Sequence, residues 1–404
     1  MSRDIDKLWF VLVALLISGG MSQALSAQTA GDAGSPHLAY IGTLDHKLLI
    51  IDEDQDAVVG EIQLGGTPRT AALSADQKQI YIINTQMTIE IVDLATRKVT
   101  GTIDLSDEHS RARTTATARN WFNGDGAQAR FSGIAVDPNG RYLYSTLRMI
   151  TRDKNEYHLD PPKFVVIDLQ TKAVVKSFDF PKEYDTGFGF RATFKVSPDG
   201  KFLYVFDDDI MIMDLSSFTI VDRIPLAKPP YPGASPYRLT AGDDPYDGVA
   251  SVTSLFVSVD PIVHKGTLGL ASLDMTTRKI TYTPIGADLP MIGFMVAPGK
   301  RLGYSVMYTG AGGNRTTEWW TWDLQTHRVI NRAPLEARTT FSFGISGDGT
   351  KLYLYGSGST LEIFNAHTLK SEKLLFLNKD LTTRMVTLAR DGDAIGTGAH
   401  VGAQ

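Results

Sequence analysis

The chain has 404 residues, of which 43% are hydrophobic and 21% charged, so it can bury a large core and is not globally disordered. Its formal net charge of −5 disfavours a nucleic-acid partner, which would require a basic face to neutralise phosphates. The sequence contains no cysteine, which excludes disulfides, thiolate nucleophiles, zinc–thiolate sites and cysteine-ligated iron–sulfur clusters.

The first 27 residues have the pattern of a secretory signal peptide. Arg3 and Lys7 precede an apolar run at 8–17, and small residues follow at 24–27. That run is too short to span a hydrocarbon core of ~30 Å. Asp4 and Asp6 weaken the basic start, so retention as an uncleaved anchor stays open. We expect a signal peptide at 1–27, a linker at 28–36, and a periplasmic or secreted protein with no membrane span in the mature chain.

After this region one element recurs seven times: a β-branched run ends in Asp or Asn, and an apolar residue and a polar turn follow. The Asp and Asn positions are Asp52, Asp93, Asp168, Asp214, Asp274, Asp323 and Asn365. Such a residue accepts backbone N–H groups further along the turn and reverses the chain. Another turn, in clear or looser form, precedes each element, as in Ser197-Pro198-Asp199-Gly200. Pro presets φ and Gly accepts positive φ, which is typical of hairpins.

Each unit is therefore expected to contain strand A, a Pro-Asp-Gly turn, strand B, a loop, strand C, an Asp-Leu turn and strand D. Four antiparallel strands in about 40–45 residues predict a propeller blade. The chain enters at 37–42 as a strand B and leaves through 383–392 as a strand A, which would complete the first blade. We predict an all-β, seven-bladed β-propeller over residues 37–392, closed by the C-terminal strand, with a tail at 393–404. Six or eight blades, or a β-sandwich, are the alternatives.

Residues 131–144, 193–205 and 345–354 resemble the YVTN-type repeat, whose units run roughly Pro-x-Gly-Val-Ala-Val-Ser-Pro-Asp-Gly-Lys-x-Leu-Tyr-Val, and 67–74 is a divergent copy. In overall form the chain is also similar to the beta (heavy) chain of quinoprotein amine dehydrogenases. This second resemblance implies that a cofactor would sit mainly in a separate small subunit.

The predicted blades have two unequal faces. The A–B and C–D turns are short throughout, so we call their side the short-turn face. Loops B–C and D–A carry the long insertions, 104–128 and 148–163 among them, and their side is the loop-bearing face. Binding surfaces are commonly built from such loops on a rigid scaffold. Candidate binding residues on this face are Trp121, Tyr157, His158, Asp160, Asp207 and Asp208.

Arginine stands five to eight residues before the A–B turn in six units, and Met291 takes that place in the sixth blade. The six are Arg69, Arg130, Arg191, Arg238, Arg338 and Arg384. Guanidinium groups around the mouth of the central channel would suit a carboxylate or phosphate. The alternative is that each arginine pairs with an acid of a neighbouring blade or caps a carbonyl.

No nucleophile–base pair, metal-ligand set, P-loop or dinucleotide fingerprint is recognisable, so we name no catalytic residue and predict no cofactor and no metal. The sequence favours an exported binding or scaffold propeller that holds a protein or an anionic small molecule on the loop-bearing face. One alternative is the non-cofactor propeller subunit of a periplasmic quinoprotein amine dehydrogenase-like redox complex. Another is a stand-alone propeller hydrolase such as a lactonase.

Overall fold

The computed structural model describes residues 37–104, 126–152, 156–180, 192–207, 209–226, 251–259, 262–287, 291–299, 301–310, 316–336, 341–356 and 359–388. All of the described residues belong to one compact unit, which begins at His37. In these described ranges the regular structure is strand, with no helix. Accordingly, no helix in them has the length and apolarity needed to cross a membrane.

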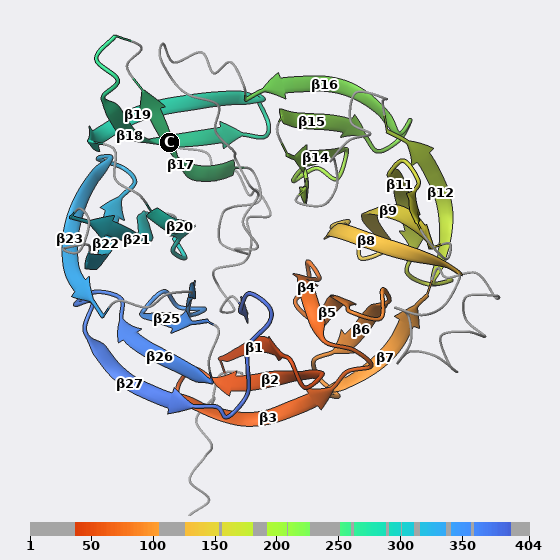
Figure 1. The fold of residues 1–404 in the computed structure, drawn as a ribbon, viewed down its shortest axis with the longest axis horizontal. Helices are drawn as coiled ribbons and strands as arrows, with labels where there is room; N and C mark the ends of the chain where they lie inside the picture. Colours follow the sequence, from red (N-terminus) through yellow and green to blue (C-terminus); the bar gives the residue numbers. More distant parts are fainter. Residues whose placement is uncertain are drawn as a thin grey trace, which may run out of the picture. The chain divides into compact units, whose positions relative to one another are not determined.

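The strands of this unit pair into seven antiparallel sheets that form the blades of a ring (Figure 1). Blade 1 contains β28 (Val386–Thr387), β1 (Leu38–Thr43), β2 (Lys47–Asp52) and β3 (Ala57–Gln63). Blade 2 contains β4 (Pro68–Leu73), β5 (Gln79–Asn84), β6 (Ile89–Asp93) and β7 (Lys98–Ile103). Blade 3 contains β8 (Gly126–Val136), β9 (Tyr142–Arg152), β11 (Lys163–Asp168) and β12 (Ala173–Asp179), with β10 (Tyr157–Leu159) added to β9.

The remaining blades follow in chain order. Blade 4 contains β13 (Thr193–Val196), β14 (Phe202–Phe206), β15 (Asp209–Asp214) and β16 (Thr219–Pro225). Blade 5 contains three described strands, β17 (Ser251–Val259), β18 (Gly266–Asp274) and β19 (Lys279–Ala287). Blade 6 contains β20 (Met291–Val296), β21 (Leu302–Thr309), β22 (Thr316–Asp323) and β23 (Arg328–Leu335). Blade 7 contains β24 (Ser342–Ile345), β25 (Lys351–Tyr355), β26 (Thr360–Asn365) and β27 (Ser371–Phe376).

The C-terminal strand closes the ring, as the sequence predicts. β28 pairs antiparallel with β1 through Tyr40↔Val386 and Ala39↔Thr387. Further along, the backbone N–H of Gly42 donates to Oγ1 of Thr383 over 2.8 Å. These contacts join segments more than 340 residues apart and cover an edge that β1 would otherwise expose. The prediction of a seven-bladed all-β propeller is confirmed.

The repeated Asp or Asn at the end of strand C builds the C–D turn in all seven blades. Its side chain accepts backbone N–H groups two and three residues further on, as Asp168 does from Gln170 and Thr171. The fourth residue after it has a left-handed backbone in every blade: Asp56, Arg97, Lys172, Phe218, Arg278, His327 and Leu369. These residues are structural, and the turns all lie on the short-turn face.

The core lies between successive blades, and a buried tyrosine of strand B fills most of these interfaces. It stands two residues after the partner of the repeated Asp or Asn, and its ring packs against the next blade. The six tyrosines are Tyr40, Tyr81, Tyr144, Tyr204, Tyr304 and Tyr353, each at most 4% exposed. In blade 5 the same register position is Thr253.

Blade 3 differs from the sequence prediction, which treated 148–163 as a loop. β9 continues to Arg152, and β10 pairs back onto it with His158 opposite Thr151, so this segment forms a hairpin. The β-branched residues Ile150 and Thr151 favour the extended conformation, and they lengthen the strand beyond the blade. β8 and β9 have 11 residues each, whereas β4 and β5 of blade 2 have 6. Because these extra residues lie at the B–C end, blade 3 is enlarged on the loop-bearing face.

Candidate functional site

The inner strands of blades 2, 3 and 4 border a cavity, which we call the inner-strand cavity. β8 lies against both β4 and β13. The cavity has a volume of about 240 Å³ and is lined by Arg69, Thr70 and Ile83 of blade 2, residues 130–134 of β8, and residues 192–194 of blade 4. Two of the predicted arginines, Arg69 and Arg130, therefore share one cavity.

Bulges in the inner strands bring these side chains to the cavity. The register of β4 shifts between Pro68 and Thr70, so Arg69 is the extra residue of that bulge. The register of β8 shifts between Ser132 and Ile134, and Gly133 has φ +61°. A Cβ atom at Gly133 would lie 2.7 Å from the carbonyl oxygen of Ala192, so the neighbouring blade permits only glycine there. Bulges of this kind re-aim side chains next to binding sites.

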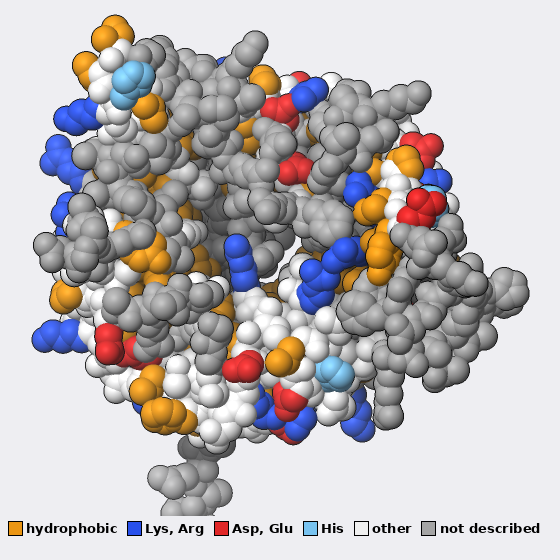
Figure 2. All heavy atoms as spheres, viewed as in Figure 1, with side chains coloured by type: hydrophobic (Ala, Val, Ile, Leu, Met, Phe, Trp, Pro, Cys, Tyr) orange, Lys and Arg blue, Asp and Glu red, His pale blue; other side chains and the backbone are white. Residues whose placement is uncertain are grey.

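Among the described residues that line the cavity, the charged side chains are the arginines Arg69 and Arg130. Arg130 of β8 stands directly opposite Arg148 of β9, and like charges in such a cross-strand pair repel. Burial, with the nearby charges of Arg69 and Arg148, lowers the pKa of Arg130. The guanidinium nevertheless stays protonated at neutral pH. Figure 2 shows Lys and Arg side chains facing the central opening of the ring. An anion placed here would offset the repulsion among the three arginines.

Hydroxyl groups supply further polar atoms at the cavity. Oγ1 of Thr193 is buried and has no hydrogen-bond partner among the described residues. Oγ1 of Thr146 donates to the carbonyl oxygen of Ser132 over 2.6 Å, and Oγ of Ser145 donates to that of Gly133 over 2.8 Å. The carbonyls at the bulge are thus satisfied within blade 3. Thr193 retains an unused buried donor beside two arginines, and leaving such a group without a partner is unfavourable.

The other predicted binding residues are placed differently. Arg384 is exposed and lies two residues before β28, and it does not line the inner-strand cavity. Tyr157, His158 and Asp160 are exposed on or after β10 at the loop-bearing face, where Nε2 of His158 lies 3.0 Å from Oε1 of Glu156. Five of the predicted binding residues fall outside the described ranges: Trp121, Arg191, Asp208, Arg238 and Arg338.

The described acidic residues after β14, Asp207 and Asp209, make hydrogen bonds within blade 4. Oδ2 of Asp209 accepts a hydrogen bond from Nε of Arg223 over 2.7 Å, and its Oδ1 accepts one from the backbone N–H of Leu226 over 2.9 Å. The backbone N–H of Asp207 donates to the carbonyl oxygen of Asp209 over 3.0 Å. Asp209 therefore ties β15 to the end of β16, while Asp207 is half-buried beside it.

Sequence reasoning missed Arg148 as a site residue. It treated Arg148 as the start of a loop, because no turn signal marked where β9 ends. The signal that could have found it is the pairing of strands A and B around the Asp137-Pro138-Asn139-Gly140 turn, since counting outward from that turn sets Arg148 close to Arg130.

No family model matches the sequence, and no curated protein sequence matches it. Among solved structures, the chain is similar to Kuenenia stuttgartiensis hydrazine synthase, with 16% identity, 74% of this chain and 76% of that chain covered, and a TM-score of 0.45. It is also similar to dihydro-heme d1 dehydrogenase NirN in complex with DHE, with 16% identity, 89% and 76% covered, and a TM-score of 0.49. The fold assignment rests on the strand pairing of the chain itself, and the resemblances to YVTN repeats and to amine dehydrogenases stay predictions.

Proposed function

We propose that this propeller is a ligand-binding module whose inner-strand cavity holds the anionic group, a carboxylate or a phosphate, of a small molecule or of a partner protein. The observation that carries this proposal is the convergence of Arg69 and Arg130 on one cavity, with Arg148 opposite Arg130. The buried hydroxyl of Thr193, which has no hydrogen-bond partner in the described part of the chain, supplies a neutral donor next to them.

The charge distribution supports the same conclusion. The chain as a whole is acidic, with a formal net charge of −5, so a cluster of three arginines is a local exception. A concave site lined by positive groups raises the local concentration of negatively charged ligands. Guanidinium groups present paired donors that match the geometry of carboxylate and phosphate oxygens. Neither the redox-subunit nor the hydrolase alternative has a structural observation that favours it, and both stay predictions.

Calorimetric titration with inorganic phosphate and with citrate tests the proposal. The variants are Arg130→Gln and Arg69→Gln, and the control is Arg141→Gln. Arg141 is an exposed arginine of blade 3 that follows the A–B turn, and its Nε lies 3.6 Å from Oδ2 of Asp168. Removing a charge-assisted hydrogen bond costs about 1.5–3 kcal/mol, so each site variant should weaken binding at least tenfold. The control should bind as the wild type does. Equal binding by all four proteins, or binding by none, would refute the proposal.

A further inference from the structure

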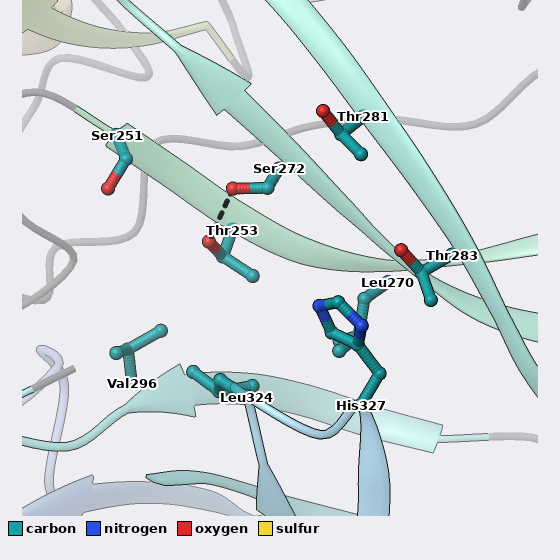
Figure 3. A pocket seen from close by; sticks show the side chains of 9 residues that line it. All are labelled: Ser251, Thr253, Leu270, Ser272, Thr281, Thr283, Val296, Leu324 and His327. Atoms are coloured by element: carbon teal, nitrogen blue, oxygen red, sulfur yellow. Dashed lines mark hydrogen bonds between the residues drawn. The ribbon is translucent and has the colours of Figure 1, made fainter. Parts of the chain in front are cut away.

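The interface between blades 5 and 6 contains a second cavity, on the short-turn face. Its volume is about 230 Å³, and its walls carry the hydroxyls of Ser251, Thr253, Ser272, Thr281 and Thr283 from blade 5. Val296, Leu324 and His327 of blade 6 lie opposite them, and Leu270 of blade 5 lies beside the His327 ring (Figure 3). We call this space the blade 5–6 cavity.

The cavity lies where six sister interfaces hold a tyrosine. Thr253 pairs with Ser272 in the register that joins Tyr204 to Ile212 in blade 4 and Tyr353 to Ile363 in blade 7. Where blades 4 and 7 have a phenol ring and an isoleucine side chain, blade 5 thus has two small hydroxyl residues. Oγ1 of Thr253 and Oγ of Ser272 are 3.1 Å apart and hydrogen-bond to each other. Small residues at a position that large ones fill in the other blades leave space between the blades, and the cavity lies in that space.

The bulge between strands C and D lies at a different position in blade 5, and the hydroxyls of Thr281 and Thr283 on strand D line the cavity. In the other six blades the register between strands C and D shifts directly after the residue opposite the tyrosine, as at Ile212/Met213. In blade 5 the shift lies earlier, between Leu268 and Gly269. Strand D therefore pairs without interruption along the cavity, with Thr281 opposite Ser272 and Thr283 opposite Leu270. The threonine at the position of the repeated tyrosine and the changed position of the bulge both affect the strands that line this cavity.

The interface between blades 4 and 5 shows what a phenol can contact in this position. The hydroxyl of Tyr204 donates to the carbonyl oxygen of Met275, the residue after the repeated Asp of the next blade, over 2.5 Å. Leu324 holds the equivalent position in blade 6 and lines the cavity. A ring that filled this space would contact Leu270, Val296 and Leu324, and its hydroxyl would lie near His327 and the threonines that line the cavity. An engineered apolar cavity of about 150 Å³ accommodates benzene, so 230 Å³ is enough for a substituted phenol.

From this geometry we infer that the blade 5–6 cavity is a binding site for a small neutral molecule with a hydroxylated aromatic ring, of the phenol class. The ligand takes the place that the strand B tyrosine occupies in the other blades. The site is separate from the inner-strand cavity: it is formed by other blades, and it lies at the end of the sheets where the C–D turns are.

Titration with p-cresol, which is the tyrosine side chain as a free molecule, tests the inference. The wild type should bind p-cresol saturably at one site, and toluene, which lacks the hydroxyl, at least tenfold more weakly. Thr253→Tyr should bind p-cresol at least tenfold more weakly, because it places the repeat's own phenol in the cavity. The matched control is Thr219→Tyr, at an exposed position on β16 of blade 4, which should bind as the wild type does.

Ser272→Ile, which introduces the residue that blade 4 has at this register position, Ile212, is a second occluding variant in case Thr253→Tyr does not fold. Each variant is first shown to unfold cooperatively at a midpoint near that of the wild type. Undiminished p-cresol binding by a folded occluding variant would overturn the assignment of the site. Absence of p-cresol binding to the wild type would overturn it as well, and so would preferential binding of a non-aromatic polyol such as glucose.

Discussion

Glu53, at the closure of the ring, gives the protein a pH-dependent stability whose sign follows from the structure. It follows the repeated Asp of blade 1, is 4% exposed, and its Oε2 accepts the backbone N–H of Gly347 in blade 7 over 3.0 Å. Burial, chiefly, raises its pKa from 4.5 to about 7. The hydrogen bonds from Gly347 and from the hydroxyl of Tyr353 lower the pKa, as does the charge of His37, whereas that of Asp348 raises it.

Between pH 4.5 and about 7 the folded protein holds a proton on Glu53 that the unfolded chain has released. The folded state binds more protons in this window, so its stability falls as pH rises. The difference between the two pKa values corresponds to a contribution of about 3 kcal/mol at most to the free energy of unfolding. This contribution is fully present below pH 4.5 and is lost above pH 7. Glu53→Gln keeps an uncharged acceptor for Gly347 and removes the titration. Its stability relative to the wild type should therefore increase by about 3 kcal/mol between pH 4 and pH 8.

Urea unfolding of both proteins at pH 4, 5.5, 7 and 8 measures this difference. The control is Glu61→Gln, an exposed carboxylate whose pKa is lowered by its hydrogen bond to Lys47. Since a lowered pKa contributes stability that is lost only as pH falls below about 4.5, this variant should show no change relative to the wild type between pH 5.5 and pH 8. A stability difference between Glu53→Gln and the wild type that is the same at every pH would refute the reasoning.

Three further outcomes follow from the packing. Tyr204→Thr places the residue of blade 5 in a fully buried position of blade 4 and should lower the free energy of unfolding by about 3–5 kcal/mol in urea titrations. Thr253→Tyr should not lower it. Similar losses for both variants would contradict the packing role given to the tyrosine. Gly133→Ala should cost about 2 kcal/mol by the same assay, since φ is +61° and the Ala192 carbonyl lies 2.7 Å from the added Cβ; a neutral effect would mean that the bulge is not required. Truncation after residue 382 removes β28 and leaves the edge of β1 open, so the thermal midpoint should fall and aggregation on heating should rise; an unchanged melting curve would show that β28 does not close the ring.

The architecture could be predicted because the blade repeats chemistry that acts locally. The C–D turn depends on one carboxylate or amide and on backbone groups two and three residues away, so Asp52 and Asn365 reveal their turns in the sequence alone. Closure could also be predicted, because 383–392 resembles a strand A, and the first blade begins with strand B and has no strand A before it in the sequence.

The sites could be predicted only in part, because they depend on register between distant strands. The arginine spacing pointed to Arg69 and Arg130, which line one cavity, and their binding role stays a prediction. Each bulge shifts by one residue the side chains that face a given side of a strand, and the bulges at Arg69 and Gly133 have no sequence signal strong enough to place them. Arg148 was hidden in a segment expected to be a loop. The blade 5–6 cavity is visible only when Thr253 is aligned with six tyrosines, and that alignment requires the observed strand pairing.

The central claim, that an anion binds between Arg69 and Arg130, is tested most directly by a crystal structure of the protein soaked in selenate. The anomalous signal locates the anion without reference to any other atom. The account predicts a selenium peak in the inner-strand cavity, with selenate oxygens within hydrogen-bonding distance of both guanidinium groups and of Oγ1 of Thr193. A cavity without such a peak, while selenate occupies other sites of the molecule, would contradict it.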